Sequence, residues 1–257
     1  MHNFTDTHCH LDFPVFDRDR DTILEQCREH NIKSIVVPGV EAAHWLRVLS
    51  ICQSPDLFPA LGLHPCFLEK HQPEDLVWLR QLCESENLAA IGEIGLDYYV
   101  KSLDKDKQRY YFVEQLGIAR EYNLPVLIHA RKSHDEILKL LKSYSQIRGI
   151  IHAYSGSYEQ AVEFLKLGFK LGFGGAYTFP RATKLRSLVE RLPIEAWVLE
   201  TDAPDMSPLL HHQQRNSPEY LPEIASVLFA LTENRFSAEQ VITQLEVNTN
   251  SIFPAIQ

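Results

Sequence analysis

The sequence predicts an α/β protein built as a (β/α)8 TIM barrel. Short apolar runs rich in β-branched residues, bounded by Gly and Pro, alternate with longer segments of helical period. About eight such strand-then-helix units fit into the 257 residues, which is the usual size of this barrel. Neither a linker-like shift in composition nor a low-complexity tract interrupts the pattern. We therefore expect one domain over residues 1–257, with an open, doubly wound sheet as the alternative fold.

Each element follows from the local pattern of apolar and polar residues. The predicted strands are Phe4–Thr7, Ser34–Pro38, Phe58–Leu63, Leu88–Ile94, Pro125–Ile128, Gly149–Ile151, Lys170–Phe173 and Trp197–Glu200. The predicted helices are Arg18–His30, Pro73–Ser85, Asp106–Tyr122, His134–Ser143, Tyr158–Leu167, Ala182–Leu192, Pro218–Thr232 and Ala238–Asn250. The last two helices follow the final strand.

Composition indicates a globular protein and argues against a disordered, coiled-coil or membrane-spanning chain. The chain is 45% hydrophobic and 23% charged, a balance typical of globular proteins and not of disordered or coiled-coil chains. Its apolar runs are far shorter than the roughly 18–20 residues of a membrane span, and the N-terminus does not resemble a signal peptide. The five cysteines form no C-x-x-C pair and are expected to be reduced thiols. We expect a cytoplasmic protein without a membrane or an obligate protein partner.

The net charge of −9 argues against a broad basic surface for nucleic acid. It leaves open a nucleic-acid substrate that is held locally, at a site whose positive charge comes from bound metal.

Polar side chains of the ligand type follow six of the eight predicted strands. The segments are Asp6–His10, Gly62–Pro65, Gly92–Asp97, His129–Arg131, His152–Gly156 and Glu200–Pro204. Because active sites of TIM barrels form at the C-terminal ends of the strands, we expect these side chains to meet there.

Single members of this set also fit structural roles. His8 and His10 share one face of an extended segment, but an H-x-H pair alone is a weak metal signal. His64, directly before a proline, is also typical of a turn cap. Glu93 lies among small and apolar residues, where burial is costly without a cation; a salt-bridged core carboxylate is the alternative.

Taken together, the set indicates a centre for two divalent cations. It comprises four imidazoles and two carboxylates, which are His8, His10, His129, His152, Glu93 and Asp202. These exceed the needs of one tetrahedral zinc site and suit two ions roughly 3.5–4 Å apart. Mixed nitrogen and oxygen donors favour zinc or manganese over magnesium. The sequence contains no P-loop, dinucleotide-binding or G-x-S-x-G motif, so nucleoside triphosphate, dinucleotide and serine chemistry are not predicted.

At these residues the sequence resembles the TatD family of metal-dependent hydrolases, and within it the YjjV-like branch. The matching segments are Asp6–Asp12, Ala60–Pro65, Ile91–Tyr98, Leu127–Arg131, Tyr177–Lys184, Leu199–Met206 and Arg215–Pro218. The resemblance runs from near Phe4 to the C-terminal helices.

The resemblance implies an amidohydrolase-type TIM barrel with a two-metal site at its mouth. It assigns the first metal to His8, His10 and Asp202, the bridging position to Glu93, and the second metal to His129 and His152. These assignments come from matching motif positions. It also implies a hydrolase of ester bonds, a deoxyribonuclease that often acts as a 3′-to-5′ exonuclease on single strands.

The hypothetical mechanism uses a water activated by the metals. Asp202 is the candidate to orient this water and take its proton, together with Glu93 as a catalytic ligand. Arg131 and His64 are candidate contacts to a phosphate, since arginine makes forked hydrogen bonds to phosphate. A surface ion pair and a turn cap are their structural alternatives. Asn216 is expected to line the mouth.

Two other functions fit the same residues. The first is hydrolysis of a small phosphoester, amide or lactone, because attack on a carbonyl centre also uses a metal-activated water. In some enzymes that hydrolyse amides or lactones, a carboxylated lysine bridges the two metals. No lysine stands at the predicted strand ends, which argues against this function. The second is a non-catalytic metal-binding protein, against which the retained Asp202 argues.

Overall fold

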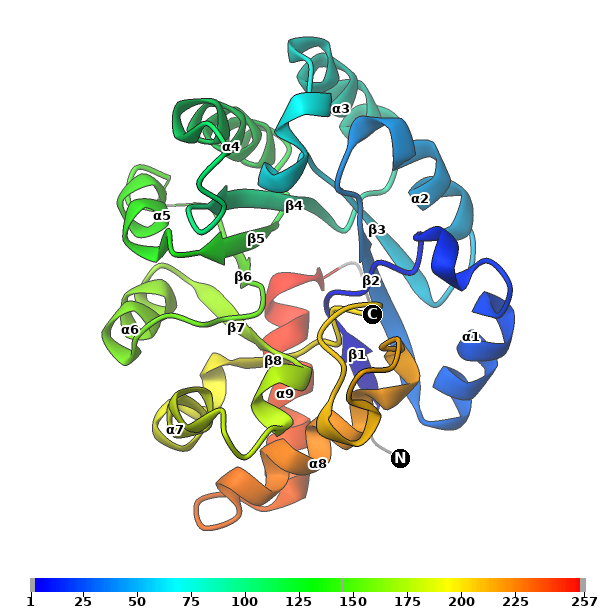
Figure 1. The fold of residues 1–257 in the computed structure, drawn as a ribbon, viewed down its shortest axis with the longest axis vertical. Coiled ribbons are helices and arrows are strands. Elements are labelled where there is room, and N and C mark those ends of the chain that lie inside the picture. Colours follow the sequence, from blue (N-terminus) through cyan, green and yellow to red (C-terminus); the bar gives the residue numbers. More distant parts are fainter. Residues whose placement is uncertain (1–2, 145, 255–257) are drawn as a thin grey trace.

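The eight parallel strands of one sheet form the centre of the molecule, and helices surround them (Figure 1). The computed structural model describes residues 3–144 and 146–254. The strands are β1 (Phe4–Asp6), β2 (Ile32–Pro38), β3 (Leu57–Leu61), β4 (Ala90–Asp97), β5 (Val126–Arg131), β6 (Gly149–Ile151), β7 (Phe169–Phe173) and β8 (Trp197–Leu199). Their order in the sheet is their order in the sequence. This order confirms the predicted barrel and excludes the doubly wound alternative.

The first and last strands meet through backbone hydrogen bonds just beyond their ends. The amide of Thr7 donates to the carbonyl oxygen of Leu199 at 3.0 Å, and the amide of Asp202 donates to that of His8 at 2.9 Å. These bonds bring the two ends of the sheet together and place the predicted ligands of β1 beside the predicted ligand that follows β8.

The helices lie on the outside of the strands, between successive strands and after β8 (Figure 1). They are α1 (Arg20–Glu29), α2 (Trp45–Ile51), α3 (Pro73–Ser85), α4 (Lys105–Glu121), α5 (His134–Leu141), α6 (Tyr158–Lys166), α7 (Thr183–Arg191), α8 (Leu221–Thr232) and α9 (Ala238–Ile252). Local capping sets their starts: the carboxylate of Asp104 accepts hydrogen bonds from the amides of Asp106 and Lys107, which begins α4. Among the described residues, no helix is both long and apolar enough to cross a membrane.

The structure differs from the predicted elements mainly at two places. The short helix α2 was not predicted, because its seven residues span too few turns to show a clear helical period. Strands β4 and β5 run beyond their apolar cores, since Asp97 and Arg131 pair in register and continue the ladder. This extension carries both polar residues to the rim of the barrel.

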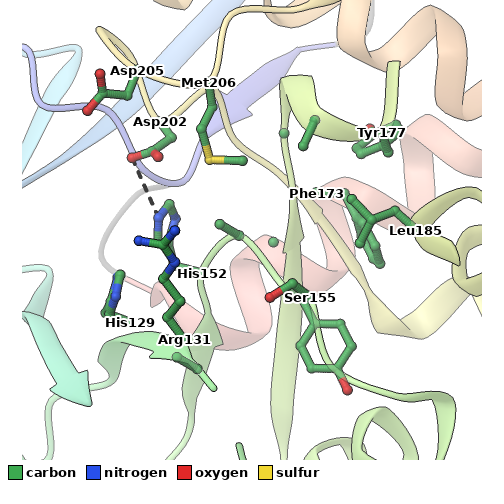
Figure 2. A pocket seen from close by; sticks show the side chains of 16 residues that line it. His129, Arg131, His152, Ser155, Phe173, Tyr177, Leu185, Asp202, Asp205 and Met206 are labelled. Carbon is green, nitrogen blue, oxygen red and sulfur yellow. Dashed lines mark ion pairs between the residues drawn. The ribbon is translucent and has the colours of Figure 1, made fainter. Parts of the chain in front are cut away.

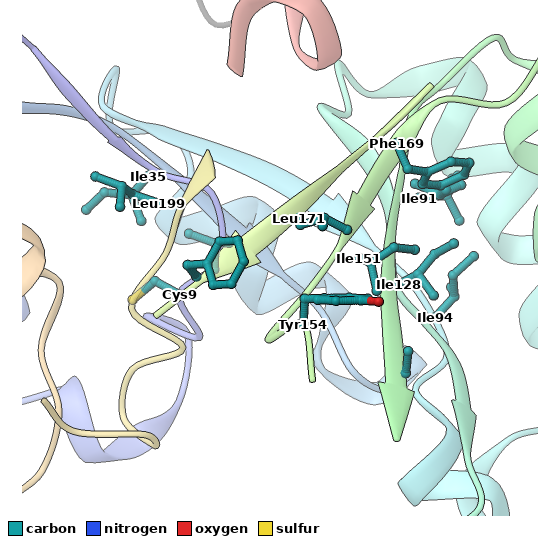
Figure 3. Packing of buried hydrophobic residues seen from close by; sticks show 14 of the residues in the cluster. Cys9, Ile35, Ile91, Ile94, Ile128, Ile151, Tyr154, Phe169, Leu171 and Leu199 are labelled. Atoms are coloured by element: carbon teal, nitrogen blue, oxygen red, sulfur yellow. The ribbon is translucent and has the colours of Figure 1, made fainter. Parts of the chain in front are cut away.

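The buried apolar residues form two clusters, one between the strands and the helices and one inside the barrel. Side chains that face the helices form the larger layer, part of which Figure 3 shows around Ile94, Ile128 and Ile151. A smaller cluster inside the barrel includes Ile252 and Phe253 at the end of α9. These two residues pack at the N-terminal end of the strands, so the opposite end is left for the polar side chains.

Candidate metal centre

The structure brings all six predicted ligands into one cluster at the C-terminal ends of the strands, in which four are buried and His129 and Asp202 are partly exposed. His8 and His10 follow β1, Glu93 lies in β4, and His129 lies in β5. His152 and Asp202 follow β6 and β8. Three of them, His129, His152 and Asp202, are seen at one side of the pocket in Figure 2.

Four donor atoms from three strands face one another in the first part of this cluster. The Nε2 atoms of His8 and His10 are 3.3 Å apart. Glu93 Oε2 lies 3.2 Å from the first and 3.5 Å from the second. Asp202 Oδ1 lies 3.9 Å and 3.7 Å from the same two nitrogens. Spacings of this size are close to those between neighbouring ligand atoms around a single divalent cation.

Glu93 connects this group to a second one. Its other oxygen, Oε1, lies 3.1 Å from His129 Nδ1 and 3.3 Å from His64 Nε2. Each carboxylate oxygen therefore faces a different pair of imidazoles, which is the arrangement that a bridging carboxylate requires. His64, Cys66 and His129 form a further group of potential ligands at this edge of the cluster.

Carboxylates stand behind two of the imidazoles. Glu200 Oε1 lies 3.1 Å from His152 Nδ1, while Nε2 of the same ring is 3.5 Å from Asp202 Oδ1. Asp97 Oδ2 lies 3.1 Å from His129 Nε2. Metal-bound histidines commonly have such partners, which fix the ring and its tautomer. The sequence showed Glu200 and Asp97 at strand ends, but gave no indication of the histidine that each one faces.

The charges of the cluster fit cationic occupants. Burial alone would lower the pKa of His10, but the hydrogen bond and charge of Glu93 raise it to about 9. Burial likewise opposes protonation of His152, while Glu200 and Asp202 raise its pKa to about 10. The buried carboxylates thus draw positive charge to their centre. A divalent cation supplies that charge and displaces these protons, so the donor set fits metal ions.

His64 and Arg131 lie where contact with a substrate is expected. His64 is buried; its Nδ1 accepts the amide of Cys66 at 3.1 Å, so it caps a turn and also faces the centre. Arg131 is half exposed, and its guanidinium lies 3.9 Å over the ring of Tyr99. It lines the pocket beside the cluster.

Asn216 lies away from the pocket, although it was expected to line the mouth. Its side chain is fully buried, and its Nδ2 donates to the carbonyl oxygens of Thr201 at 2.8 Å and Asp205 at 2.7 Å. These bonds hold the chain on both sides of Asp202. This geometry favours a positioning role, and contact of Asn216 with substrate stays a prediction.

The pocket over the cluster has two unlike sides. Its volume is about 460 Å³. Three of the predicted ligands (His129, His152 and Asp202) and Arg131 form one side, and Phe173, Tyr177 and Leu185 gather on the other (Figure 2). A polar reacting group and an apolar substituent can therefore be accommodated together.

The fold and the site define a metal-dependent hydrolase on a TIM barrel. The chain belongs to the TatD family, because the family model described as TatD related DNase matches residues 5–254. This confirms the resemblance seen in the sequence. The chain is similar to the uncharacterized metal-dependent hydrolase YjjV of Escherichia coli K12, with 41% identity over 255 residues and 97% of each chain covered.

Two further comparisons bear on fold and function. The crystal structure of Escherichia coli K12 YjjV, described as a TatD homolog, superposes with a TM-score of 0.93, at 38% identity and with 98% of both chains covered. A protein of Erwinia tasmaniensis named 3′-5′ ssDNA/RNA exonuclease TatD is 31% identical over 248 residues, covering 93% of this chain and 95% of the relative.

Proposed function

We propose that the protein is a phosphodiesterase with two divalent cations, zinc or manganese in preference to magnesium, and that it shortens DNA from the 3′ end. The observation that carries this proposal is the position of Glu93, whose two oxygens face different pairs of imidazoles. One of these imidazoles, His129, lines a pocket together with Arg131. The exonuclease name of the Erwinia relative supports DNA or RNA as the substrate class.

The six predicted ligands are assigned to two cations. His8, His10 and Asp202 would hold one, and Glu93 would join it to the other. The resemblance to the family assigns the second cation to His129 and His152, while Glu93 Oε1 faces His129 together with His64, and His152 Nε2 faces Asp202. When bound, such cations lower the pKa of water and neutralise charge on a phosphoryl group.

Asp202 is the candidate base. Its side chain is 14% exposed, whereas that of Glu93 is 3% exposed, so Asp202 reaches the pocket more readily. Burial raises the pKa of Asp202 to about 6, against the opposing charges of His152 and His10. A carboxylate with a pKa near neutrality can orient an attacking water and accept its proton.

Arg131 and His64 would orient the phosphodiester. The guanidinium of Arg131 stands at the border of the pocket, where it can donate two hydrogen bonds to phosphate oxygens. His64 approaches from the β3 side, beside Glu93 Oε1.

The test is hydrolysis of a short, 5′-labelled single-stranded DNA by metal-free protein to which zinc, manganese or magnesium is added back. We expect a ladder of products shortened stepwise from the 3′ end, only with metal present. His129→Ala and Asp202→Asn should each lower the rate about 100-fold or more, since removal of groups that act in the transition state has effects of this size.

Two controls make the result specific. Circular dichroism and metal content must show that the variants are folded and how much metal each one binds. If the wild-type protein binds two metals per chain and leaves DNA uncut, the nuclease proposal is wrong. A panel of small phosphoesters, amides and lactones is then the next assay.

A further inference from the structure

A second hollow adjoins the metal pocket, and the two share Arg131 and Ser155 as lining residues. We call it the β4–β6 groove, and define it by Tyr98, Tyr99, Arg131, Lys132, Ser155 and Lys184. Its volume is about 980 Å³, larger than the metal pocket. It lies over the C-terminal ends of β4, β5 and β6 and reaches α7. A substrate that is longer than the metal pocket can therefore continue into this groove.

Two lysines without a carboxylate partner line the groove, although the whole chain has a net charge of −9. Lys132 and Lys184 line it, and neither has a carboxylate within 4.0 Å among the residues that the structure describes.

Two acidic side chains also line the groove. Glu136 pairs with Arg109, whereas Asp135 accepts a hydrogen bond at 2.6 Å from the uncharged amide of Gln160, which does not offset its charge. Lys132 and Lys184 together outnumber Asp135, so an anionic ligand in the groove meets an excess of positive charge.

An aromatic ring stands beside these charges. The side chain of Tyr99 is 56% exposed, and the guanidinium of Arg131 covers one face of its ring at 3.9 Å. Exposed aromatic rings next to arginine and lysine are the usual means of binding single-stranded nucleic acid, because bases stack on the rings while the cations follow the phosphates.

The backbone at Lys132 is also unusual. Its φ of 57° lies in the left-handed region, which costs a residue with a side chain about 1–2 kcal/mol. The turn directs the chain from β5 into α5 and places a lysine at the groove, in a conformation that glycine would adopt more easily.

We propose that the β4–β6 groove is a second subsite, which binds the nucleotides next to the scissile phosphodiester in a single-stranded nucleic acid. In this subsite Tyr99 stacks with a base, and Lys132 and Lys184 contact phosphates. This inference rests on the proposed nuclease function. It predicts that the protein binds and cuts oligonucleotides several residues long better than dinucleotides.

The first test measures binding without chemistry. Fluorescence anisotropy of a labelled twelve-nucleotide oligothymidylate is titrated with metal-free protein at several salt concentrations. For Lys132→Gln/Lys184→Gln we expect a Kd about tenfold higher, and a shallower dependence of log Kd on log salt, by roughly 0.7 for each phosphate that a lysine no longer neutralises. Tyr99→Ala should also raise Kd about tenfold, because a base can no longer stack on the ring. Lys139→Gln removes the same charge from α5 outside the groove and should leave Kd unchanged.

The second test measures rates with manganese, on the oligothymidylate and on bis(p-nitrophenyl) phosphate. The reporter ester is too small to occupy both hollows. We expect the ratio of the two kcat/KM values to fall about tenfold in the double lysine variant and to stay constant in Lys139→Gln.

The outcomes separate the two proposals. If the variants bind and cut the oligonucleotide as the wild type does, the groove proposal is overturned and the nuclease proposal stands. If the variants bind more weakly but the wild type cuts no phosphodiester, the groove is a nucleic-acid site and the nuclease proposal is overturned.

Discussion

The carboxylate of Glu200 lies 3.1 Å from Nδ1 of His152, on the side of the ring opposite to the nitrogen that faces Asp202. Glu200 is fully buried, and the same oxygen also accepts the amide of Ala153 at 2.7 Å. Gly172 allows this approach, because a Cβ at this glycine would lie 2.0 Å from Glu200 Oε2. The ring of His152 therefore lies beside a carboxylate that itself has little room to move.

Replacement of Glu200 by Gln should weaken metal binding. The variant keeps the size of the side chain but removes the charge that raises the basicity of His152 and fixes its tautomer. Partners of this kind contribute about 10–100-fold to metal affinity. Competition with a chromophoric chelator measures the affinity. Glu195→Gln, an exposed change just before β8, is the control and should bind metal as the wild type does. Equal affinities for all three proteins would show that Glu200 does not act through His152.

Removal of metal should lower the melting temperature. Cations that bind only the native state stabilise it by about 2.7 kcal/mol at a hundredfold excess over Kd, which corresponds to several degrees for a chain of this size. Scanning calorimetry with a chelator, and then with zinc or manganese restored, measures the shift. In Asp202→Asn the shift should be smaller. A melting temperature that does not respond to chelator or metal contradicts the metal centre.

Acid should destabilise the protein through His134, which lies outside the metal cluster. The side chain is 7% exposed and meets the rings of Tyr154 and Phe164 edge-on. Burial lowers its pKa to about 4, against the opposing charge of Asp135. The unfolded chain takes up this proton near pH 6.5 and the folded protein only near pH 4, so stability falls as pH decreases between these values. The full loss is about 3 kcal/mol, at about 1.4 kcal/mol per pKa unit.

Urea unfolding of metal-free wild type and His134→Phe at several pH values tests this effect. The wild type should lose more unfolding free energy than the variant between about pH 7 and about pH 4.5. Parallel curves for the two proteins would mean that His134 titrates alike in both states.

Gly117→Ala should stabilise the barrel. Gly117 lies within α4, and a Cβ built there has no atom within 4 Å. Alanine restricts the unfolded chain and favours the helix, so the free energy of unfolding should rise by about 0.5–1 kcal/mol. The urea midpoint measures the change. Gly172→Ala is the contrasting variant, since its Cβ would collide with Glu200, and it should be destabilised. A loss of stability in Gly117→Ala contradicts the open space seen beside this glycine.

The sequence predicts the barrel and the ligand cluster because both depend on patterns within short segments of the chain. Each strand is a short apolar run, and each predicted ligand stands within or directly after one. His129, for example, follows Val126–Ile128, and His152 follows Gly149–Ile151. The repeating order of the elements then carries these ends to one rim of the barrel.

Side-chain contacts between different strands cannot be predicted from such short segments. The pairing of Glu200 with His152 and of Asp97 with His129 depends on the register of neighbouring strands, which a one-dimensional pattern does not report. Asn216 shows a different limit. A polar residue in a loop suggests exposure, yet its amide is buried because two backbone carbonyls satisfy it.

Because β1 meets β8 in the closed barrel, the ligand cluster combines residues from the beginning and from the end of protein synthesis. His8 and His10 are made first, whereas Asp202, which faces both of them, comes after the last strand. A chain still attached to the ribosome therefore has only one of the two carboxylates that face these imidazoles, because Glu93 in β4 is made before β8 and Asp202 after it. Under the proposed assignment, the first cation site stays incomplete until β8 and Asp202 have been made.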